Sequence, residues 1–302
     1  MHKKPWFLYA LITTISWGVW GAFIEITEKA GFPATLGYIV WALTMIPCAV
    51  VALMIIKWKL ETDLKSIILG SIVGLFGAGG QLLLFLALRD GPAYIVFPFI
   101  GLYPVLTIIL SVIFLKEKAT KRQWIGIIIA LIAALFLAYQ KPGESAAKGY
   151  MWLILSICVF VLWAVQSYVM KASNLTMKAE SIFFYMMTGA VLFIPVAWFM
   201  TDFSQEINWS FKGPYLAAII HLLNSIGALT IVYALRYGKA IVIVPMVGVS
   251  PRIITVIISL VIYSVIPGPV LSIGLILAII AITLMLKRET EASEINSDQK
   301  EK

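Results

Sequence analysis

An arginine stands inside a long apolar stretch near the end of the chain. Arg252 follows Ala240 by 12 residues, which corresponds to about 18 Å along a helix that rises about 1.5 Å per residue. If this stretch crosses a bilayer, a charge at that depth costs at least about 2.5 kcal/mol and needs a partner or a water-filled cavity. The guanidinium group suits bidentate binding of a carboxylate or a phosphate. Arg252 is therefore a candidate substrate-binding residue, and an internal structural pair is the alternative.

Four other polar side chains stand in apolar stretches. Gln81 and Asn224 carry amides, which in lipid need partners on neighbouring helices or in a central cavity. His221 lies one turn before Asn224 on the same helical face, and Glu25 ends the first apolar stretch. Histidine and glutamate can take up and release a proton. We therefore predict Gln81 and Asn224 as substrate-binding residues, with helix packing as the alternative. We predict Glu25 and His221 as coupling residues. The alternatives are an interfacial carboxylate for Glu25 and a satisfied core histidine for His221.

Aromatic side chains cluster in the same stretches. Trp17, Trp20 and Trp163 lie far from the ends of their apolar segments, so an aromatic belt at the membrane surface does not explain them. Tyr94 and Tyr103 belong to the same group. Such rings can pack against an apolar or a cationic substrate. All five are candidate substrate-binding residues, with packing between helices as the alternative.

The elements that must position these residues are membrane-spanning helices. Hydrophobic residues make up 61% of the chain and charged residues 13%, whereas soluble domains have about 45–50% and about 25%. A helix needs about 20 apolar residues to cross a bilayer. We therefore predict an all-α integral membrane protein with ten spans. The spans lie at about 6–26, 34–56, 66–88, 93–115, 123–140, 150–170, 181–200, 214–235, 240–265 and 270–286.

The basic residues predict the orientation. With the N-terminus in the cytoplasm, the inner connections and termini carry 17 Lys and Arg and the outer ones carry 5, as the positive-inside rule requires. This bias explains the net charge of +8 without a nucleic-acid partner. It predicts a multi-pass protein of a bacterial-type inner (plasma) membrane, with membrane lipid around it and both termini cytoplasmic. Residues 287–302 form a polar stretch that predicts a disordered cytoplasmic tail.

A motif near the middle of each half reveals an internal repeat. Residues 88–93 (LRDGPA) and 235–240 (LRYGKA) lie 147 positions apart, and the prolines and glycines that follow keep the same spacing. Five predicted spans in each half turn the second copy upside down, which is a common arrangement in secondary transporters. We predict two inverted five-helix repeats, residues 1–140 and 149–286. We also expect the span to be interrupted in each copy and to flex there during gating; the flexing points are Gly101, Pro104, Gly248 and Pro251.

Several short motifs occur along the chain: Trp17-Gly18, ALRxGxA at residues 87–93 and 234–240, and FLKE at 114–117 before QWIG at 123–126. In these motifs the chain resembles the drug/metabolite transporter superfamily, in its EamA-like branch. The resemblance implies a ten-helix fold that moves a small metabolite, of the amino acid, sugar or organic anion class, by alternating access. The two halves have diverged, because Ser264 stands where the first half has Glu117, and Arg252 stands where it has Val105.

These observations together predict a secondary transporter of a small molecule. The sequence contains no Walker motif (GxxxxGK[ST]), so a proton or sodium gradient, or the gradient of the substrate itself, must drive transport. A membrane receptor or assembly subunit without transport is one alternative. A membrane-embedded enzyme is another, but the chain lacks HExxH and a nucleophile elbow, so we expect no enzyme, cofactor or metal site. The substrate, the direction of transport and the oligomeric state stay open.

Overall fold

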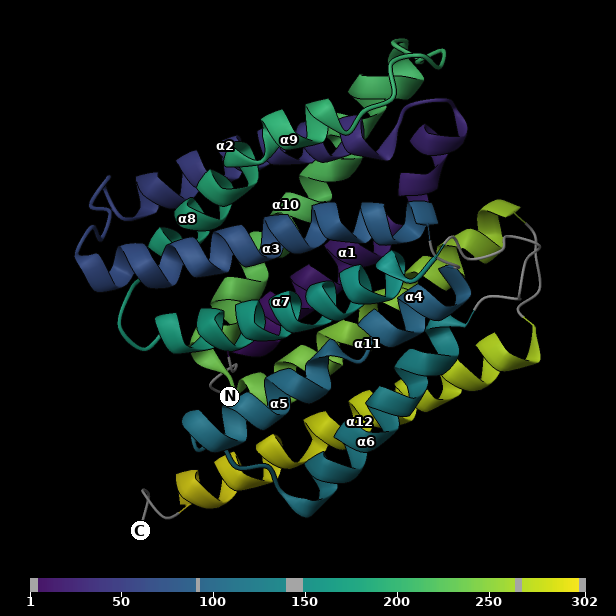
Figure 1. The fold of residues 1–302 in the computed structure, drawn as a ribbon. Helices are drawn as coiled ribbons and strands as arrows, with labels where there is room; N and C mark the ends of the chain where they lie inside the picture. The colour runs from purple at the N-terminus through teal and green to yellow at the C-terminus, as the bar shows by residue number, and fades with distance from the viewer. Residues whose placement is uncertain (1–4, 91–92, 140–148, 264–267, 299–302) are drawn as a thin grey trace.

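The computed structural model describes residues 5–90, 93–139, 149–263 and 268–298 (Figure 1). Every regular element within these residues is helical. The first half consists of α1 (Pro5–Lys29), α2 (Ala34–Ile55), α3 (Leu64–Asp90), α4 (Ala93–Ile100), α5 (Tyr103–Phe114) and α6 (Lys121–Ala138). The second half consists of α7 (Met151–Ser173), α8 (Ala179–Leu192), α9 (Ile194–Phe199), a π-helical turn η1 (Phe211–Tyr215), α10 (Leu216–Tyr237), α11 (Ala240–Tyr263) and α12 (Pro269–Asp298).

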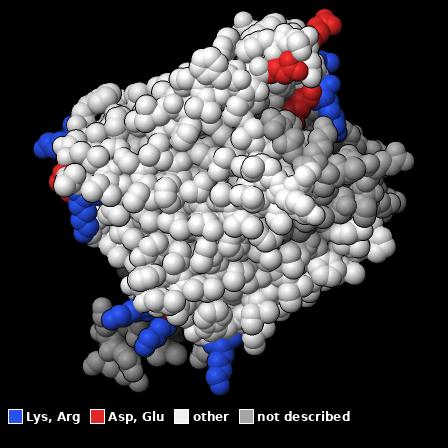
Figure 2. Space-filling view, viewed as in Figure 1, with Lys and Arg blue, Asp and Glu red and all other residues white. Residues whose placement is uncertain are grey.

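Eight helical segments of the described chain are long and apolar enough to cross a membrane. The two remaining predicted spans contain the short helices α4 and α5 and the helix α6, so the count of ten spans stays a prediction. Apolar side chains such as Met54, Ile113 and Val261 are more than half exposed, as expected where lipid replaces water as the solvent. Figure 2 shows a broad surface without Lys, Arg, Asp or Glu, and the charges lie at its borders. The protein is therefore a multi-pass membrane protein.

The helices of the two halves pack against each other in a reciprocal way. Helix α3 packs along α7, and its counterpart α10 packs along α1. Helix α5 also packs on α7, while its counterpart α11 packs on α1. Helices α6 and α12 pair with each other at one side of the molecule (Figure 1). The predicted boundary between the halves, residues 141–148, lies outside the described residues.

The predicted interruption occurs in one half only. In the first half, α4 ends at Ile100 and α5 begins at Tyr103. Pro104 then falls in the first turn of α5, where the missing N–H has no intrahelical acceptor to lose. In the second half, α11 is one helix through Pro245, Gly248 and Pro251, so the prediction of a second break is wrong.

Close packing against α1 explains why α11 stays continuous. The hydroxyls of Thr14 and Ser250 are hydrogen-bonded at 2.7 Å, and Thr255 Oγ1 donates to the carbonyl of Gly18 at 2.8 Å. Gly18 lets the two helices approach, because a Cβ at that position would lie 2.5 Å from Ile254 Cβ. Neighbouring helices and hydroxyl side chains of this kind make proline tolerable inside a spanning helix.

The end of the chain also differs from the prediction. Helix α12 continues to Asp298, whereas the polar composition predicts disorder from residue 287. The physical reason is that residues 287–298 extend a helix that is already nucleated, for which each added residue costs little, and the segment contains three Glu but neither Pro nor Gly.

Candidate functional site

A central cavity of about 250 Å³ lies between the two halves. Its lining comes from α1, α2, α3 and α5 of the first half and from α7, α8, α10 and α11 of the second. The wall is mostly aromatic, aliphatic or Met side chains, with a few amides and hydroxyls. Its aromatic and polar lining residues are Trp17, Trp20, Trp41, Gln81, Tyr103, Trp163, Gln166, Ser167 and Asn224.

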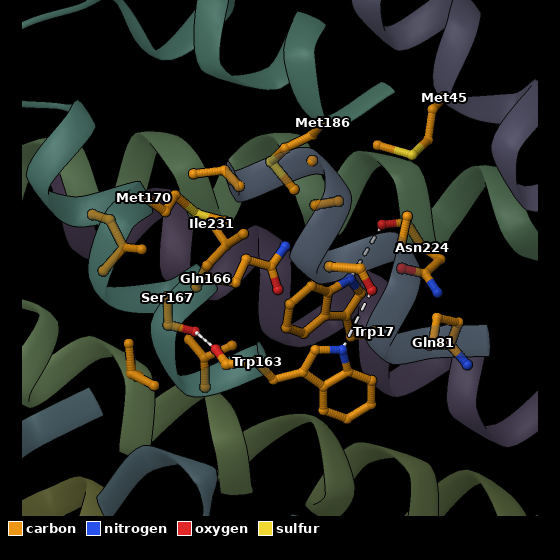
Figure 3. Close-up of a pocket in the computed structure, with 18 of the residues that line it drawn as sticks. Trp17, Met45, Gln81, Trp163, Gln166, Ser167, Met170, Met186, Asn224 and Ile231 are labelled. Carbon is orange, nitrogen blue, oxygen red and sulfur yellow. Dashed lines mark hydrogen bonds between the residues drawn. The ribbon is translucent and has the colours of Figure 1, made fainter. Parts of the chain in front are cut away.

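Most of the predicted substrate-binding residues come together in this cavity. Six of them line it: Trp17, Trp20, Gln81, Tyr103, Trp163 and Asn224. Figure 3 shows the rings of Trp17 and Trp163 and the amides of Gln81 and Asn224 around the same space. The side chain of Tyr94 lies outside the described residues, and Arg252 is not part of the lining.

Trp17 and Trp163 are held in equivalent ways by opposite halves. Trp17 Nε1 on α1 donates to the carbonyl of Asn224 on α10 at 3.1 Å. Trp163 Nε1 on α7 donates to the carbonyl of Gly77 on α3 at 3.4 Å. Asn224 follows Gly77 by 147 positions, and Trp163 follows Trp17 by 146. The same interaction is therefore made twice, each time across the two halves.

Each of these tryptophans also packs against a glycine of the facing helix. A Cβ on Gly227 would overlap Cδ1 and Nε1 of Trp17, and a Cβ on Gly80 would lie 2.5 Å from Trp163 Nε1. Gly227 follows Gly80 by 147 positions. Both indoles thus need a glycine at the corresponding place in the other half to lie against the backbone.

Trp20 has a side-chain partner behind the cavity wall. Trp20 Nε1 donates to His221 Nδ1 at 3.3 Å. Since Nδ1 accepts, the neutral ring carries its proton on Nε2, and this nitrogen has no hydrogen-bond partner among the described residues. His221 is 6% exposed and does not line the cavity. The structure thus places the predicted coupling residue His221 directly behind Trp20.

Of the two predicted charged residues Arg252 and Glu25, only Arg252 has a described side chain. Arg252 Nη1 donates to the carbonyl of Ala134 on α6 at 3.1 Å, and the guanidinium is close enough to Tyr103 for an electrostatic interaction. Because Tyr103 lines the cavity, Arg252 lies one residue behind the wall and joins α11 to α6. The side chain of Glu25 lies outside the described residues.

The predicted flexing points meet between the two halves. Gly101 lies at the break between α4 and α5, and Pro104 follows in the first turn of α5. A Cβ on Gly248 of α11 would lie 3.7 Å from Pro104 Cγ, an ordinary contact distance. Pro251 lies one turn further along α11. Pro104 of the first copy and Gly248 of the second thus face each other across the contact between α5 and α11.

A charged cluster fastens the turn between α10 and α11, which we term the α10–α11 corner (residues 235–241). The carboxylate of Glu117 accepts from the backbone N–H groups of Ala240 and Ile241 at 3.1 and 3.0 Å. A carboxylate at this place also complements the positive end of the α11 dipole. The turn between α5 and α6 is thereby attached to the beginning of α11.

Two lysines complete the same corner. Lys171 Nζ donates to the carbonyls of Leu235 and Gly238 at 2.9 and 2.7 Å, and Lys239 Nζ donates to the carbonyl of Lys118 at 2.8 Å. A cation at the end of α10 satisfies carbonyls that the helix leaves open. The corner therefore ties α5, α7, α10 and α11 together at one end of the cavity.

Sequence reasoning missed several lining residues, of which Gln166 is the most informative. Gln166 follows Trp163 by three positions on α7 and so shares its helical face. An amide inside an apolar span is the same signal that singles out Gln81 and Asn224, and it could have found Gln166. Trp41 also lines the cavity, and its place inside the predicted span 34–56 is the same signal that singles out Trp20. Ser167 lines the cavity as well, and for it only the neighbouring helices decide which side of the helix faces inward.

Comparisons with known proteins agree with this architecture. The chain matches the EamA-like transporter family over residues 4–139. An uncharacterized protein of Methanocaldococcus jannaschii is 31% identical over 136 residues, which is 44% of this chain and 96% of that protein. Protein LicB of Haemophilus influenzae is 23% identical over 223 residues, 71% of this chain and 75% of LicB.

The fold is also known from a solved structure. One crystal structure aligns with a TM-score of 0.74 over 92% of this chain and 98% of that chain, at 17% sequence identity. The match to the EamA-like transporter family places this membrane protein in the drug/metabolite transporter superfamily. The chain belongs to the EamA-like transporter family of that superfamily.

Proposed function

We propose that this protein is a secondary transporter that moves a small metabolite across a bacterial-type inner membrane by alternating access. Ten spans in two inverted five-helix repeats, with both termini in the cytoplasm, provide the framework. The observation that carries the proposal is the central cavity, to which both halves contribute their corresponding helices. A solute held between two halves can be exposed to either side when one half rocks against the other.

The reciprocal contacts support the inverted repeats. Trp17 binds the third helix of the second half, and Trp163 binds the third helix of the first. A two-fold relation between the halves produces this exchange, since each contact is then the copy of the other. The bias of 17 basic residues against 5 supports the orientation.

We assign the α10–α11 corner as the cytoplasmic gate. Glu117 and Lys239 join this corner to the α5–α6 turn of the first half, and Lys171 joins it to α7 of the second half. Opening toward the cytoplasm then requires these hydrogen bonds to break. The contact between Pro104 and Gly248 lies deeper and serves as the flexing point. Leucine at Gly101 or Gly248 is expected to abolish transport while membrane insertion persists, and full transport in both variants would contradict this assignment.

The cavity lining favours a solute with an apolar face and a few hydrogen-bonding groups. No Lys, Arg, His, Asp or Glu is among the described lining residues. Of the three predicted substrate classes, an organic anion would need Arg252 to leave the carbonyl of Ala134 and turn toward Tyr103. The carboxylate of an amino acid would need Arg252 in the same way, whereas a sugar-like solute can use the amides and hydroxyls that are already there. A proton or sodium gradient, or the gradient of the solute, drives the cycle.

Counterflow in liposomes tests the proposal. The full-length protein is reconstituted with a concentrated unlabelled metabolite inside, and uptake of a labelled library is measured. We expect one class of solute to accumulate, and Ala228→Phe, which fills the cavity, to abolish the accumulation. Ile157→Phe on the exposed surface of α7 is the matched control.

The other outcomes identify the alternatives. Folded protein that accumulates no member of the library would favour a receptor or assembly subunit. A solute that leaves the liposomes chemically changed would favour an enzyme.

A further inference from the structure

Three amide side chains in the cavity are left without a protein partner. Gln81, Gln166 and Asn224 all line the cavity, and within the described residues none of their side-chain amides forms a hydrogen bond. An amide offers two donors and two acceptor sites, and leaving these unsatisfied away from water is costly. The occupant of the cavity, either water or solute, must therefore satisfy them.

Gln166 is the most constrained of the three. Its amide points into the cavity beside Trp17 (Figure 3). Behind it lies Gly77 of α3, where an added Cβ would collide with Gln166 Nε2. The amide thus rests against the backbone of the other half and has no space to withdraw. It presents a polar edge within a wall formed largely by indole and thioether side chains.

The internal repeat shows how the surroundings of Gln166 differ from those of its counterpart in the first half. The counterpart of Gln166 is Trp20, 146 positions earlier, and the counterpart of His221 is Gly74. In the first half the polar N–H of Trp20 is satisfied by His221. In the second half Gly74 offers no side chain to Gln166. The two halves have the same frame, but Trp20 is paired with His221, whereas its counterpart Gln166 keeps its hydrogen-bonding groups free for a ligand.

We propose that Gln166 is the residue that determines polar specificity, and that it binds an uncharged solute bearing a donor next to an acceptor, as in a carboxamide. This inference rests on the proposed function and names its substrate class. A carboxamide complements the amide of Gln166 with two antiparallel hydrogen bonds. The aromatic wall takes the apolar part of the solute, and the lining offers no cationic side chain to pair with an anionic one.

Binding of matched phenyl probes tests the inference. The full-length protein in nanodiscs is titrated with benzamide, acetophenone, benzoate and phenyltrimethylammonium by ligand-observed NMR, with empty nanodiscs and Ala228→Phe protein as blanks. Acetophenone keeps the shape and the carbonyl of benzamide but lacks its N–H donors. We expect benzamide to bind about 10-fold more tightly than acetophenone, the difference that one paired amide supplies, and both charged probes to bind more weakly than benzamide.

Variants assign the effect to Gln166. Gln166→Leu is expected to bind benzamide and acetophenone equally while keeping its melting temperature. Gly77→Ala displaces the amide and is expected to reduce the preference for benzamide. Gly79→Ala is the matched control on the same helix, because a Cβ there meets Phe193 at an ordinary 3.5 Å, and it should keep the preference.

Other results of these experiments would overturn the role of Gln166, the uncharged substrate class or the proposal of transport. A folded Gln166→Leu protein that still prefers benzamide overturns the role of Gln166. Tightest binding of phenyltrimethylammonium or benzoate overturns the uncharged class, the former through cation–π contacts with the indoles. If counterflow fails while the four probes still bind in the expected order, the proposal of transport is wrong but the proposed binding site stands. The two proposals therefore fail separately.

Discussion

The cavity has two corresponding walls, one formed by α1 and α10 and the other by α3 and α7. Both walls hold a tryptophan against a glycine and a backbone carbonyl of the opposite half. They differ one turn away from this tryptophan. In the first wall Trp20 is hydrogen-bonded to His221, and in the second wall Gln166 lies against Gly77. The shared part maintains the contact between the halves. The diverged part makes the cavity asymmetric.

The largest expected loss of stability is at the glycines against which the tryptophans of both walls pack. Alanine at Gly227 or Gly80 forces an indole away from the facing helix, and overpacking of this kind costs about 1–3 kcal/mol. We expect Gly227→Ala to be the more destabilising, because its Cβ would lie closer to Trp17 Nε1 than the 2.5 Å at which a Cβ on Gly80 would lie from Trp163 Nε1. The melting temperature in detergent measures both. Gly79→Ala is the control, and an unchanged stability of both variants would mean that the indoles do not depend on these contacts.

A smaller effect is expected when only the hydrogen bonds are removed. Trp17→Phe and Trp163→Phe keep an aromatic ring but leave a carbonyl without its donor, at a cost of about 0.5–1.5 kcal/mol each. The bond of Trp17 is shorter, 3.1 Å against 3.4 Å, so Trp17→Phe should lower the unfolding temperature more. The reverse order would show that the two walls are not equivalent even in their shared part.

The diverged part can be probed through His221. Asparagine places its Oδ1 near the position of Nδ1 and can still accept from Trp20, whereas leucine cannot. We expect His221→Asn to keep the wild-type solute affinity and His221→Leu to weaken it about 5-fold, the equivalent of one lost neutral hydrogen bond. Uptake and the emission maximum of the tryptophans measure the change. Equal behaviour of both variants would separate His221 from the orientation of Trp20.

The smallest effect on the probes is expected for Arg252, which lies behind the wall. Arg252→Lys and Arg252→Ala should leave the ratio of benzamide to acetophenone binding unchanged, within about 2-fold, because the lining offers this probe no charged group. The measurement is the same NMR titration. A specific loss of benzoate binding in both variants would instead support the role of Arg252 as a clamp for an anionic group.

Much of the cavity could be predicted from the sequence. Trp17, Trp20 and Trp163 stood out because large aromatic residues far from span ends have no role at the membrane surface. Gln81 and Asn224 stood out because an amide in lipid needs a partner. Arg252 stood out for the same reason, but its hydrogen bond goes to the Ala134 carbonyl outside the cavity lining. An aromatic, amide or charged side chain inside a span therefore predicts a specific contact. The sequence does not show whether that contact is with the cavity or with a neighbouring helix.

The sequence by itself determined that the chain is an integral membrane protein built on a repeat. Hydropathy along the chain and matching residues 147 positions apart are local and countable properties, and they do not depend on packing. The tertiary structure decided that α4 and α5 are separate while α11 is continuous, since the contacts of α1 with Ser250 and Thr255 are long-range. It also decided that Trp20 has a partner and that Gln166 has none among the described residues, because that depends on which residue of the opposite half stands behind each side chain.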